Sequence, residues 1–436
     1  MEKTSIKIVK ILQAAGHETY WAGGCVRDML LKKEPKDYDI VTSAKPDEIE
    51  DLLEKTIPIG REFGVMLAVE GDHHFEVATF RSDSGYSDGR RPDAVLFTNA
   101  EEDAKRRDFT INGMFYDPIT EKLYDYVGGQ KDLEEHLVRF IGDPHERILE
   151  DHLRILRAVR FKSTLNFQYH PETYQTILKH SKLADEVSAE RLRDELNKMM
   201  LSEHNLDGWE DLLETGILEE VLPEVYAMKG VAQPYQYHHE GDVWAHAKQS
   251  LGSISKYASI NLRWATFLHD VGKPVTFKLA ERIRFDHHAQ EGAKITNKML
   301  RRLNFSKKDI DHITWVIEHH MMLPQLLEMP LGRQRHWFLL PHFKDLLAVF
   351  EADIAGTDPA GYEIYTKVLE AYNETMTKIP EEPTPLLSGH DIMEILNIKG
   401  GKKVGEVAQE LREKQLGHEL NTKKQAEEWV RANYLM

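Results

Sequence analysis

Two aspartates, Asp37 and Asp39, stand one residue apart in the segment KDYDIV. Because side chains alternate along a strand, both carboxylates are expected on one face, with Tyr38 on the other. Such a pair can hold two magnesium ions, one lowering the pKa of an attacking hydroxyl and the other neutralising a triphosphate and the leaving pyrophosphate. A D-x-D pair alone is more often a solvated turn. The pair therefore indicates metal-assisted phosphoryl chemistry only if other residues support it.

A glycine pair about a dozen residues earlier supplies part of that support. Gly23 and Gly24 precede a predicted helix, so the backbone can approach a ligand closely and free N–H groups can face a phosphate. Downstream, Glu76 in FEVATFR lies on another predicted strand. It is either a third carboxylate near the metals or a surface strand residue.

These elements belong to a long, ordered series over most of residues 20–200. The series comprises GGCVRDMLL, KDYDIV, FEVATFRSD, RRPD, KRRDFTIN, YVGGQKDLEEHLVRFIGDP, ERILEDHLRILRAVRF and SAERLRDEL. In this series the sequence resembles the class II tRNA nucleotidyltransferase and bacterial poly(A) polymerase family, whose members are polymerase β-like nucleotidyltransferases. The resemblance implies Mg²⁺ at Asp37 and Asp39, and a triphosphate bound by Gly23, Gly24, Arg27 and Asp28 together with that pair.

The same resemblance implies two further groups of contacts. The RRDFT-x-N element assigns Arg107, Asp108 and Asn112 to the sugar and phosphates, although an Arg-Asp pair can also be a structural ion pair. The ED-x-x-R element is present as Glu150, Asp151 and Arg154.

The spacing of the ED-x-x-R element predicts Asp151 and Arg154 on adjacent turns of one helical face. Asp accepts and Arg donates hydrogen bonds, so together they could read the Watson–Crick edge of cytosine or adenine. The alternative is a surface salt bridge between residues i and i+3. Arg157, Arg160 and the ERLRDEL residues Glu190, Arg191 and Glu195 would hold the site and the RNA end, or pin neighbouring helices together.

A histidine-dense stretch follows. His246, His269, Asp270 and Asp353 fit the H, HD, D order of the HD phosphohydrolase superfamily, and His288 and His320 occupy the positions of a two-metal variant. Imidazole and carboxylate ligands suit a divalent transition metal, whose bound hydroxide could cleave phosphoesters at RNA ends. For the remaining histidines a surface or core role is expected: His238, His239, His287, His312 and His319.

Composition and periodicity place these motifs in a multidomain chain of 436 residues. The predicted class is α+β: a small polymerase-β-like head with a mixed sheet, then an all-α neck, a helical HD domain and a helical tail. The predicted domains are 1–145 (head), 146–225 (helical neck and RNA-binding domain), 226–379 (HD domain) and 380–436 (tail). The segment Ser82–Asp93 is predicted to be a mobile loop beside the site, and PEEPTPLLSG at 380–389 a linker.

Other bulk properties restrict location and partners. No apolar run could span a bilayer, no secretory signal is evident, and the single cysteine agrees with a reducing cytoplasm. A net charge of −17 argues against a generic nucleic-acid coat, so RNA must meet a local basic surface. The candidates are Arg90-Arg91, Lys105 to Arg107, and the Arg154, Arg157, Arg160 series; Lys402 and Lys403 in the tail are expected to be solvated.

The preferred function is addition of C and A from CTP and ATP to the tRNA 3′ end, with an additional HD phosphohydrolase acting on RNA ends. An A-adding enzyme and a poly(A) polymerase share these motifs and stay open. A different class of protein, an HD phosphohydrolase with an RNA-binding head, is disfavoured by the intact Asp37 and Asp39 pair. The oligomeric state does not follow from the sequence.

Overall fold

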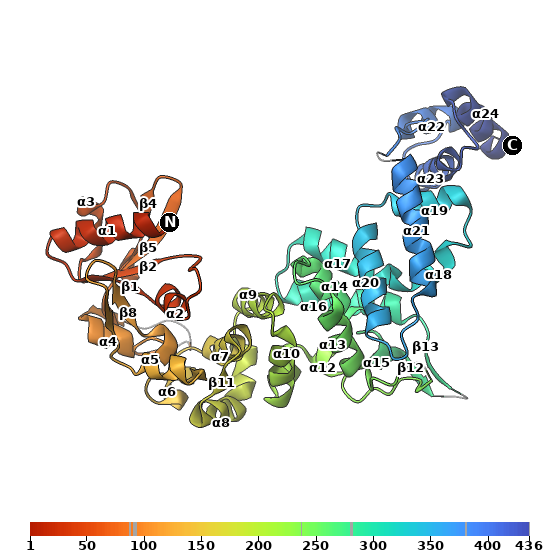
Figure 1. The fold of residues 1–436 in the computed structure, drawn as a ribbon. Helices are drawn as coiled ribbons and strands as arrows, with labels where there is room; N and C mark the ends of the chain where they lie inside the picture. Colours follow the sequence, from red (N-terminus) through yellow and green to blue (C-terminus); the bar gives the residue numbers. More distant parts are fainter. Residues whose placement is uncertain (87–88, 90–93, 237, 280–281, 380–381, 436) are drawn as a thin grey trace. The chain divides into compact units, whose positions relative to one another are not determined.

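The structure, a computed structural model, describes residues 1–86, 89, 94–236, 238–279, 282–379 and 382–435. These residues form two compact units, Met1–Val221 and Leu222–Met436. Figure 1 colours the first unit from red to yellow-green and the second from green to blue.

A seven-stranded mixed sheet forms the centre of the N-terminal part of the first unit. Its strands are β1 (Thr19–Ala22), β2 (Asp39–Thr42), β3 (Thr56–Gly60), β4 (Val65–Glu70), β5 (His73–Thr79), β8 (Phe115–Asp117) and β9 (Lys122–Tyr124). The order is β3-β4-β5-β2-β1-β8-β9, in which only β2 and β5 pair in parallel. The hairpin of β6 (Arg81–Ser84) and β7 (Ala94–Phe97) is a separate sheet.

Five helices surround this sheet: α1 (Glu2–Ala14), α2 (Gly24–Leu30), α3 (Pro46–Leu52), α4 (Ala100–Lys105) and α5 (Gly129–Glu134). Helix α1 packs on β1, β2 and α3 through one apolar face, on which Ile8, Val9 and Leu12 are fully buried (Figure 1). On the sheet, the rings of Phe80 and Phe115 lie 6.0 Å apart in the core. The rigid sheet thus fixes β1 and β2, the strands that flank the glycine pair and the aspartates.

Helices make up most of the rest of the first unit: α6 (Pro144–Glu150), α7 (Leu153–Leu165), α8 (Pro171–His180), α9 (Ala189–Met200), α10 (Asn205–Glu214) and α11 (Ile217–Val221). A two-residue parallel pair, β10 (Leu137–Val138) and β11 (Gln168–Tyr169), interrupts them. It forms because Asn166 ends α7 in a left-handed conformation with φ 58° and turns the chain back. The short strand β11 thus lies within the neck, 146–225, that the sequence predicted to be all-α.

The second unit is also helical. Its elements before the tail are α12 (Pro223–Tyr226), α13 (Val243–Ser253), α14 (Ile260–Leu268), α15 (Lys273–Thr276), β12 (Phe277–Leu279), β13 (Ile283–Phe285), α16 (His288–Arg302), α17 (Lys307–His319), α18 (Leu323–Leu326), α19 (Leu331–Phe338), α20 (Phe343–Ala355) and α21 (Glu363–Lys378). The side chains of Asp242, Ser259 and Ser306 cap α13, α14 and α17. Short 3₁₀ helices occur in both units. The first unit has η1 (Arg61–Phe63), η2 (Thr110–Asn112) and η3 (Ser181–Glu186), and the second has η4 (His320–Met322).

The tail forms its own small core from α22 (Gly389–Leu396), α23 (Lys402–Leu416) and α24 (Lys423–Tyr434). It packs on α19, where a Cβ on Gly332 would lie 1.8 Å from Glu413 O. Residues 380–381 of the predicted linker lie outside the described residues. Glu382, which directly follows them, accepts a hydrogen bond from Arg412 at 2.6 Å and is thereby held against α23.

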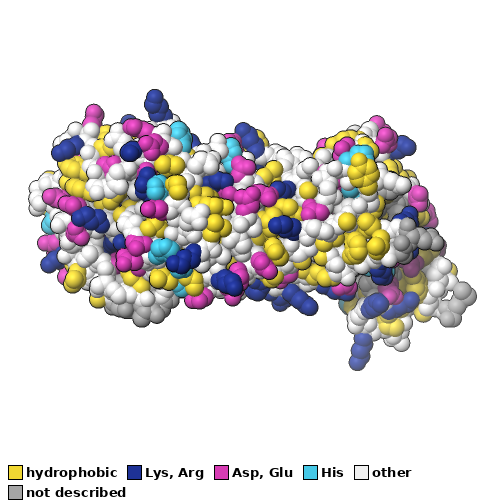
Figure 2. Space-filling view, turned by 90° about the horizontal axis from the view of Figure 1, so that it is seen from below, with side chains coloured by type: hydrophobic (Ala, Val, Ile, Leu, Met, Phe, Trp, Pro, Cys, Tyr) yellow, Lys and Arg dark blue, Asp and Glu magenta, His cyan; other side chains and the backbone are white. Residues whose placement is uncertain are grey.

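The predicted α+β class, with a mixed sheet in the head and helices after it, is confirmed. None of the helices in the described ranges is long and apolar enough to cross a membrane. On the face drawn in Figure 2, acidic and basic side chains are interspersed among hydrophobic and uncharged ones.

Candidate functional site

The turn between β1 and α2 is built from Gly23 and Gly24. Gly23 has φ 71° and ψ −129°, a backbone conformation that favours glycine. A Cβ atom on Gly23 would lie 3.5 Å from Arg107 Nη1 and 3.5 Å from Asp39 Oδ2. The bare backbone of this turn therefore adjoins one cationic and one anionic group and leaves space for a ligand.

Asp37 and Asp39 lie at the start of β2. Asp39 pairs with Ala22 of β1, and Asp37 is two residues before it. Between them Tyr38 is 7% exposed, with its ring 4.7 Å from that of Trp21. Asp37 and Asp39 line one cavity, and Tyr38 does not. The two carboxylates thus share a face opposite the buried tyrosine.

The electrostatics of this face fit a divalent cation. Burial, together with the negative charges of Asp37 and Glu76, raises the pKa of Asp39 to about 6. Glu76 is exposed on β5, the strand parallel to β2, where its neighbour Val77 pairs with Ile40. A bound cation would relieve this repulsion, and the oxygen donors are of the kind Mg²⁺ prefers.

Two arginines are held around the carboxylates by fixed partners. Arg27 donates from Nη1 to Asn112 Oδ1 at 2.7 Å and from Nε to Asp28 Oδ1 at 2.9 Å. Arg107 donates from Nε and Nη2 to Asp103 Oδ2, at 3.2 and 3.1 Å. The first arginine thus joins α2 to η2, and the second is held against α4 with its Nη1 beside Gly23.

Asp108 forms an ion pair, but not with Arg107. Its Oδ2 accepts from Arg157 Nε at 2.7 Å, and its Oδ1 accepts from Phe109 N at 2.8 Å. Burial opposes ionisation, but the charges of Arg157 and Arg154 lower the pKa of Asp108. The Arg107–Asp108 ion pair that the sequence left open is therefore not the one that forms, and Asp108 instead pairs the head with Arg157 of α7.

The expectation of one helical face carrying both Asp151 and Arg154 is wrong. Helix α6 ends at Glu150 and α7 begins at Leu153. Between them Asp151 is extended, with φ −148° and ψ 104°, and its Oδ1 accepts from Leu153 N at 3.1 Å. Asp151 follows the last residue of α6, and its side chain accepts a hydrogen bond from the first residue of α7, so the regular spacing did not mean a continuous helix.

The salt bridge considered between Asp151 and Arg154 does not form either. Both oxygens of Asp151 accept from Arg191, at 3.0 and 2.7 Å. Arg154 instead pairs with Glu150 and donates to Arg147 O at 2.8 Å. Asp151 and Arg154 nevertheless line the same cavity as the aspartate pair.

Three arginines surround the ring of Phe161 on α7. The guanidinium carbons of Arg27, Arg157 and Arg160 lie 5.4, 5.3 and 3.9 Å from its centroid. Arg160 also pairs with Glu195 of α9. A ring face attracts cations, so Phe161 helps to fix the orientation of a cluster whose members would otherwise repel one another.

These side chains line a single cavity of about 1010 Å³ with ten Lys or Arg and six Asp or Glu residues. It brings together fifteen of the predicted residues: Gly23, Gly24, Arg27, Asp28, Asp37, Asp39, Arg106, Arg107, Asp108, Asn112, Asp151, Arg154, Arg157, Arg160 and Arg191. Glu76 and Glu150 are outside its lining. Four side chains that no sequence motif singled out also line it: Lys33, Lys36, Phe161 and Lys198. Lys36 could have been found, because it directly precedes Asp37, and so could Lys33, four residues before that aspartate.

The predicted loop Ser82–Asp93 lies partly outside the described residues, which omit 87–88 and 90–93 and therefore Arg90-Arg91. Of the rest, Tyr86 donates to Asp83 Oδ2 at 3.0 Å, and Gly89 O accepts from His152 N at 3.3 Å. Two other basic candidates form ion pairs: Lys105 with Glu101 and Glu102, and Lys402 and Lys403 with Glu406.

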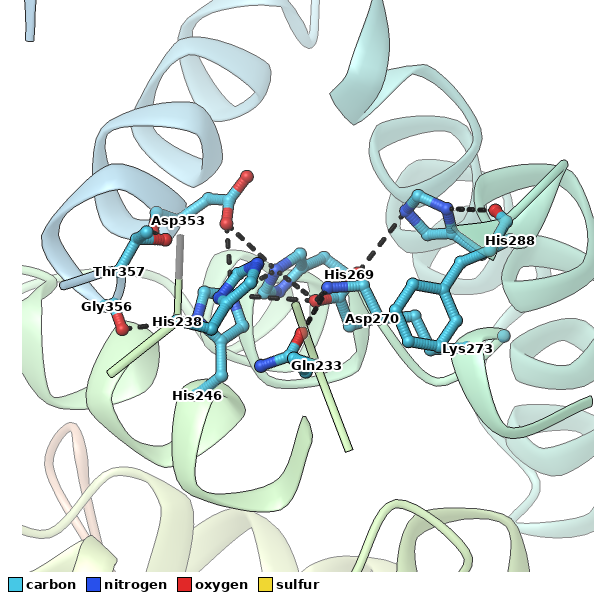
Figure 3. Close-up of polar contacts among 12 residues, drawn as sticks. Gln233, His238, His246, His269, Asp270, Lys273, His288, Asp353, Gly356 and Thr357 are labelled. Carbon is cyan, nitrogen blue, oxygen red and sulfur yellow. Dashed lines mark hydrogen bonds and ion pairs between the residues drawn. The ribbon is translucent and has the colours of Figure 1, made fainter. Parts of the chain in front are cut away.

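In the second unit, Asp270 lies between the imidazoles of His246 and His269 on one side and that of His288 on the other (Figure 3). Its Oδ2 is 3.3 Å from His269 Nε2 and 3.5 Å from His246 Nε2. Its Oδ1 is 3.3 Å from His288 Nε2 and 4.0 Å from His320 Nε2. We call the first group site A and the second site B, with Asp270 shared between them.

Asp353 completes site A. Its Oδ1 lies 3.0 Å from His246 Nε2 and 3.5 Å from His269 Nε2. The four residues predicted from the H, HD, D pattern and the two histidines predicted from its two-metal variant are therefore brought together. The Nε2 atoms within each histidine pair are 3.2 Å apart, so each pair converges on a common point, as ligands of one ion do.

The far nitrogens of these rings are anchored, which fits metal ligation. In His269, His288 and His320, Nδ1 donates to the carbonyl three residues earlier, at 2.7, 2.9 and 2.7 Å. Burial and the charges of His269 and His288 lower the pKa of His320 to about 3, which keeps that ring neutral. Burial lowers the pKa of His269, but the charges of Asp270 and Asp353 outweigh it and raise that pKa to about 10, so a bound ion would displace a proton from this ring. Imidazoles and buried carboxylates suit transition metals such as Mn²⁺, Fe²⁺, Co²⁺ or Zn²⁺.

A cavity of about 840 Å³ opens beside sites A and B. It is lined by Lys273, which bonds Gln233 Oε1 at 2.6 Å and lies 2.6 Å from Asp270 Oδ2, and by His238. His238, for which a surface or core role was expected, hydrogen-bonds Glu240 at 2.6 Å. His312 pairs with Asp345 at 2.9 Å, and His319 packs on Trp315 with ring centroids 4.7 Å apart.

Comparison with known proteins places these sites in a family. Residues 19–139 match the Poly A polymerase head domain, residues 166–228 the probable RNA and SrmB-binding site of polymerase A, and residues 237–334 the HD domain. The chain belongs to the class II tRNA nucleotidyltransferase and poly(A) polymerase family. The predicted resemblance is thus confirmed.

Curated members of this family include proteins named CCA-adding enzyme. That of Bacillus subtilis strain 168 is 38% identical over 281 residues, 62% of this chain and 66% of the relative. The Lactobacillus johnsonii protein is 43% identical over 218 residues, which are 50% of this chain and 54% of the relative. The chain thus matches about half to two thirds of the length of these relatives. The Bacillus cereus strain B4264 protein is 28% identical over 100% of this chain and 99% of its own length.

Solved structures agree at the level of the fold. The Bacillus stearothermophilus CCA-adding enzyme in complex with CTP has a TM-score of 0.74 at 25% identity, covering 98% of this chain and 96% of its own. The Thermotoga maritima CCA-adding enzyme complexed with tRNA has a TM-score of 0.57 at 21% identity, covering 98% and 94%. This family membership connects the first-unit cavity with nucleotide chemistry.

Proposed function

We propose that this family member is a CCA-adding tRNA nucleotidyltransferase that adds C and A from CTP and ATP to the tRNA 3′ end, in the cytoplasm. The observation that carries the proposal is the placement of Asp37 and Asp39 in one cavity with Asp151 and Arg154. Metal-binding carboxylates and base-reading side chains then face the same space. Relatives named CCA-adding enzyme, one of them solved with CTP, support the same assignment.

The reaction is attack of the RNA 3′-hydroxyl on the α-phosphate, with pyrophosphate leaving. Mg²⁺ at Asp37 and Asp39 would lower the pKa of the hydroxyl and neutralise the triphosphate. The protein supplies position and charge. Arg27, Arg107 and the bare Gly23 backbone face the phosphates, and their fixed partners preorganise them.

Base choice is assigned to Asp151 and Arg154. Arg191 occupies one direction on each oxygen of Asp151, and a carboxylate can accept further bonds from the amino group of a base. Arg154 keeps guanidinium N–H donors beyond those on Glu150 and Arg147. Without a helix joining them, each side chain is set by its own partners.

One assay separates the open nucleotide specificities. Purified protein with Mg²⁺, CTP and ATP is presented with tRNA ending before CCA, after C, after CC, or with unrelated RNA. Stepwise completion to CCA is expected. Addition only to tRNA ending in CC would instead identify an A-adding enzyme, and long A tails on any RNA would identify a poly(A) polymerase.

We propose a second activity, phosphohydrolysis of RNA ends, for the HD domain. It is favoured by the four imidazoles and two carboxylates of sites A and B, beside an open cavity. A transition metal there would supply a hydroxide nucleophile. Lys273 lines the cavity and would face a substrate phosphate.

The probe for this activity is an oligoribonucleotide ending in a 2′,3′-cyclic phosphate, incubated with Mn²⁺, Co²⁺ or Zn²⁺. Ring opening is expected from the native chain and not from His269→Ala. His390→Ala, at an exposed position of α22, is the matched control. Equal hydrolysis by the native chain and His269→Ala would reject the assignment.

A further inference from the structure

One metal-site histidine is oriented differently from the others. In His269, His288 and His320, Nδ1 bonds the carbonyl three residues earlier, so local backbone sets the ring. His246 has no such local acceptor. Its Nδ1 lies 3.1 Å from Glu240 Oε1 and 3.2 Å from Gly356 O.

Glu240 is unusually buried for a carboxylate. Its side chain is only 1% exposed, and three groups satisfy it. Oε1 accepts from His246 and also from His238 Nδ1 at 2.6 Å, and Oε2 accepts from Asp358 N at 3.1 Å. A carboxylate is almost never buried without such partners, so this position is built around it.

The partners of Glu240 are parts of the metal centre. His246 is a ligand of site A, His238 lines the cavity beside it, and Asp358 follows the ligand Asp353 by five residues. His239 N also donates to Asp358 O at 2.9 Å, which joins the two segments. One carboxylate therefore connects the two sequence segments that supply His246 and Asp353.

We propose that Glu240 is a positioning residue of site A, which holds His246 with its proton on Nδ1 so that Nε2 is free for the ion. A charged acceptor bonds more strongly than the Gly356 carbonyl, and it makes the imidazole a better donor to a metal. Site B has no contact with Glu240 among the described residues. The inference rests on the metal centre proposed for the HD domain.

The test is calorimetric titration of the full, chelator-treated chain with Mn²⁺. Asp37→Asn and Asp39→Asn are included as background so that the first-unit site does not contribute. Two ions are expected at the HD cluster. Glu240→Gln, which keeps the shape but not the charge, should weaken one of the two affinities about tenfold, and Glu240→Ala up to about a hundredfold, as for other residues behind metal ligands.

One control separates positioning from general damage. Glu370→Gln removes a charge from an exposed position of α21, far along the chain from Glu240. It should keep the two affinities within about threefold. If Glu240→Ala does not fold, the isosteric Glu240→Gln carries the test, with thermal unfolding as the check.

Three outcomes count against the proposal. Two affinities within twofold of the background protein in a folded Glu240→Gln would overturn it and leave the metal centre standing. Equal weakening of both ions would show a tether for the whole cluster rather than a site A residue, and would also overturn it. Fewer than two ions on the background protein would reject the metal centre itself, and the Glu240 inference with it.

Discussion

At the residue scale, Asp39 carries an energetic cost that its role explains. Burial and the charges of Asp37 and Glu76 raise its pKa from the ordinary value near 4 to about 6. In the metal-free protein the ionised form of Asp39 is therefore less favourable than that of an exposed aspartate. Active sites commonly hold such destabilising arrangements because a ligand relieves them.

Asp39→Asn should stabilise the metal-free protein. For an acid whose pKa is raised on folding, the stabilising contribution is present below the unfolded pKa and is lost as pH rises through about 6. At pH 7.5 with chelator, the Asp39→Asn variant should have a free energy of unfolding about 1–2 kcal/mol higher than the native protein, allowing for partial solvent screening. Near pH 4 the difference should vanish. Urea unfolding at both pH values measures it.

Asp72→Asn, in the exposed turn between β4 and β5, is the control for charge removal and should change stability little at either pH. Asp39→Asn should also abolish nucleotide addition. A variant that lost activity and was less stable than the native protein at pH 7.5 would contradict this account of the site.

Arg191 should determine base choice through Asp151. It donates two hydrogen bonds to that carboxylate, at 3.0 and 2.7 Å. Arg191→Met should leave Asp151 free to reorient, and change the ratio of kcat/KM for CTP and ATP about tenfold, the equivalent of roughly one charged hydrogen bond. The control is Arg193→Met on the same helix, which does not line the cavity. An unchanged ratio in Arg191→Met would contradict the prediction and show that base choice does not depend on the bonds between Arg191 and Asp151.

At the element scale, much of the head was predictable from local pattern. Strand alternation put Asp37 and Asp39 on one face, because a period of two leaves little choice once Tyr38 is buried. The break at Asp151 was not predictable from spacing. Apolar residues continue on both sides of it, and only the hydrogen bond to Leu153 N shows that the aspartate begins a new helix.

This double role of Asp151 gives a prediction about how it should be tested. Asp151→Ala removes the acceptor of Leu153 N and leaves Arg191 without its partner, so it should destabilise the protein by about 1–3 kcal/mol. Asp151→Asn keeps an acceptor for Leu153 N and should cost less than about 1 kcal/mol. Urea unfolding of the two variants measures the difference, and equal losses would mean that the bond to Leu153 N contributes nothing. Only the Asn variant is then suited to testing base choice.

The HD region shows the same limit. Its six candidate metal-binding residues follow a recognisable order in the sequence and do meet in space. Glu240 gave no comparable signal, because its role depends on Asp358 and Gly356, more than a hundred residues away. Residues that act through long-range contacts become visible only once the chain is folded.

At the scale of the whole molecule, the two proposed chemistries belong to separate units. Among the described residues, those that line the cavity with Asp37 and Asp39 belong to Met1–Val221, and those that line the cavity beside sites A and B belong to Leu222–Met436. The division into four domains remains a prediction. With a net charge of −17, the excess of basic over acidic residues in the first cavity is a local feature suited to an RNA end.

Because the two sites use different donors, they should differ in the metal that restores them. Chelator treatment should abolish both nucleotide addition and hydrolysis of a cyclic phosphate end. Mg²⁺ alone should restore addition, since the first site offers only carboxylates, but not hydrolysis, since imidazoles bind Mn²⁺ or Co²⁺ in preference to Mg²⁺. Asp37→Ala should abolish addition and leave Mn²⁺-supported hydrolysis within about twofold, and His269→Ala should do the reverse. Loss of both activities in either folded variant would contradict two independent sites, because neither cavity lining includes a residue of the other unit.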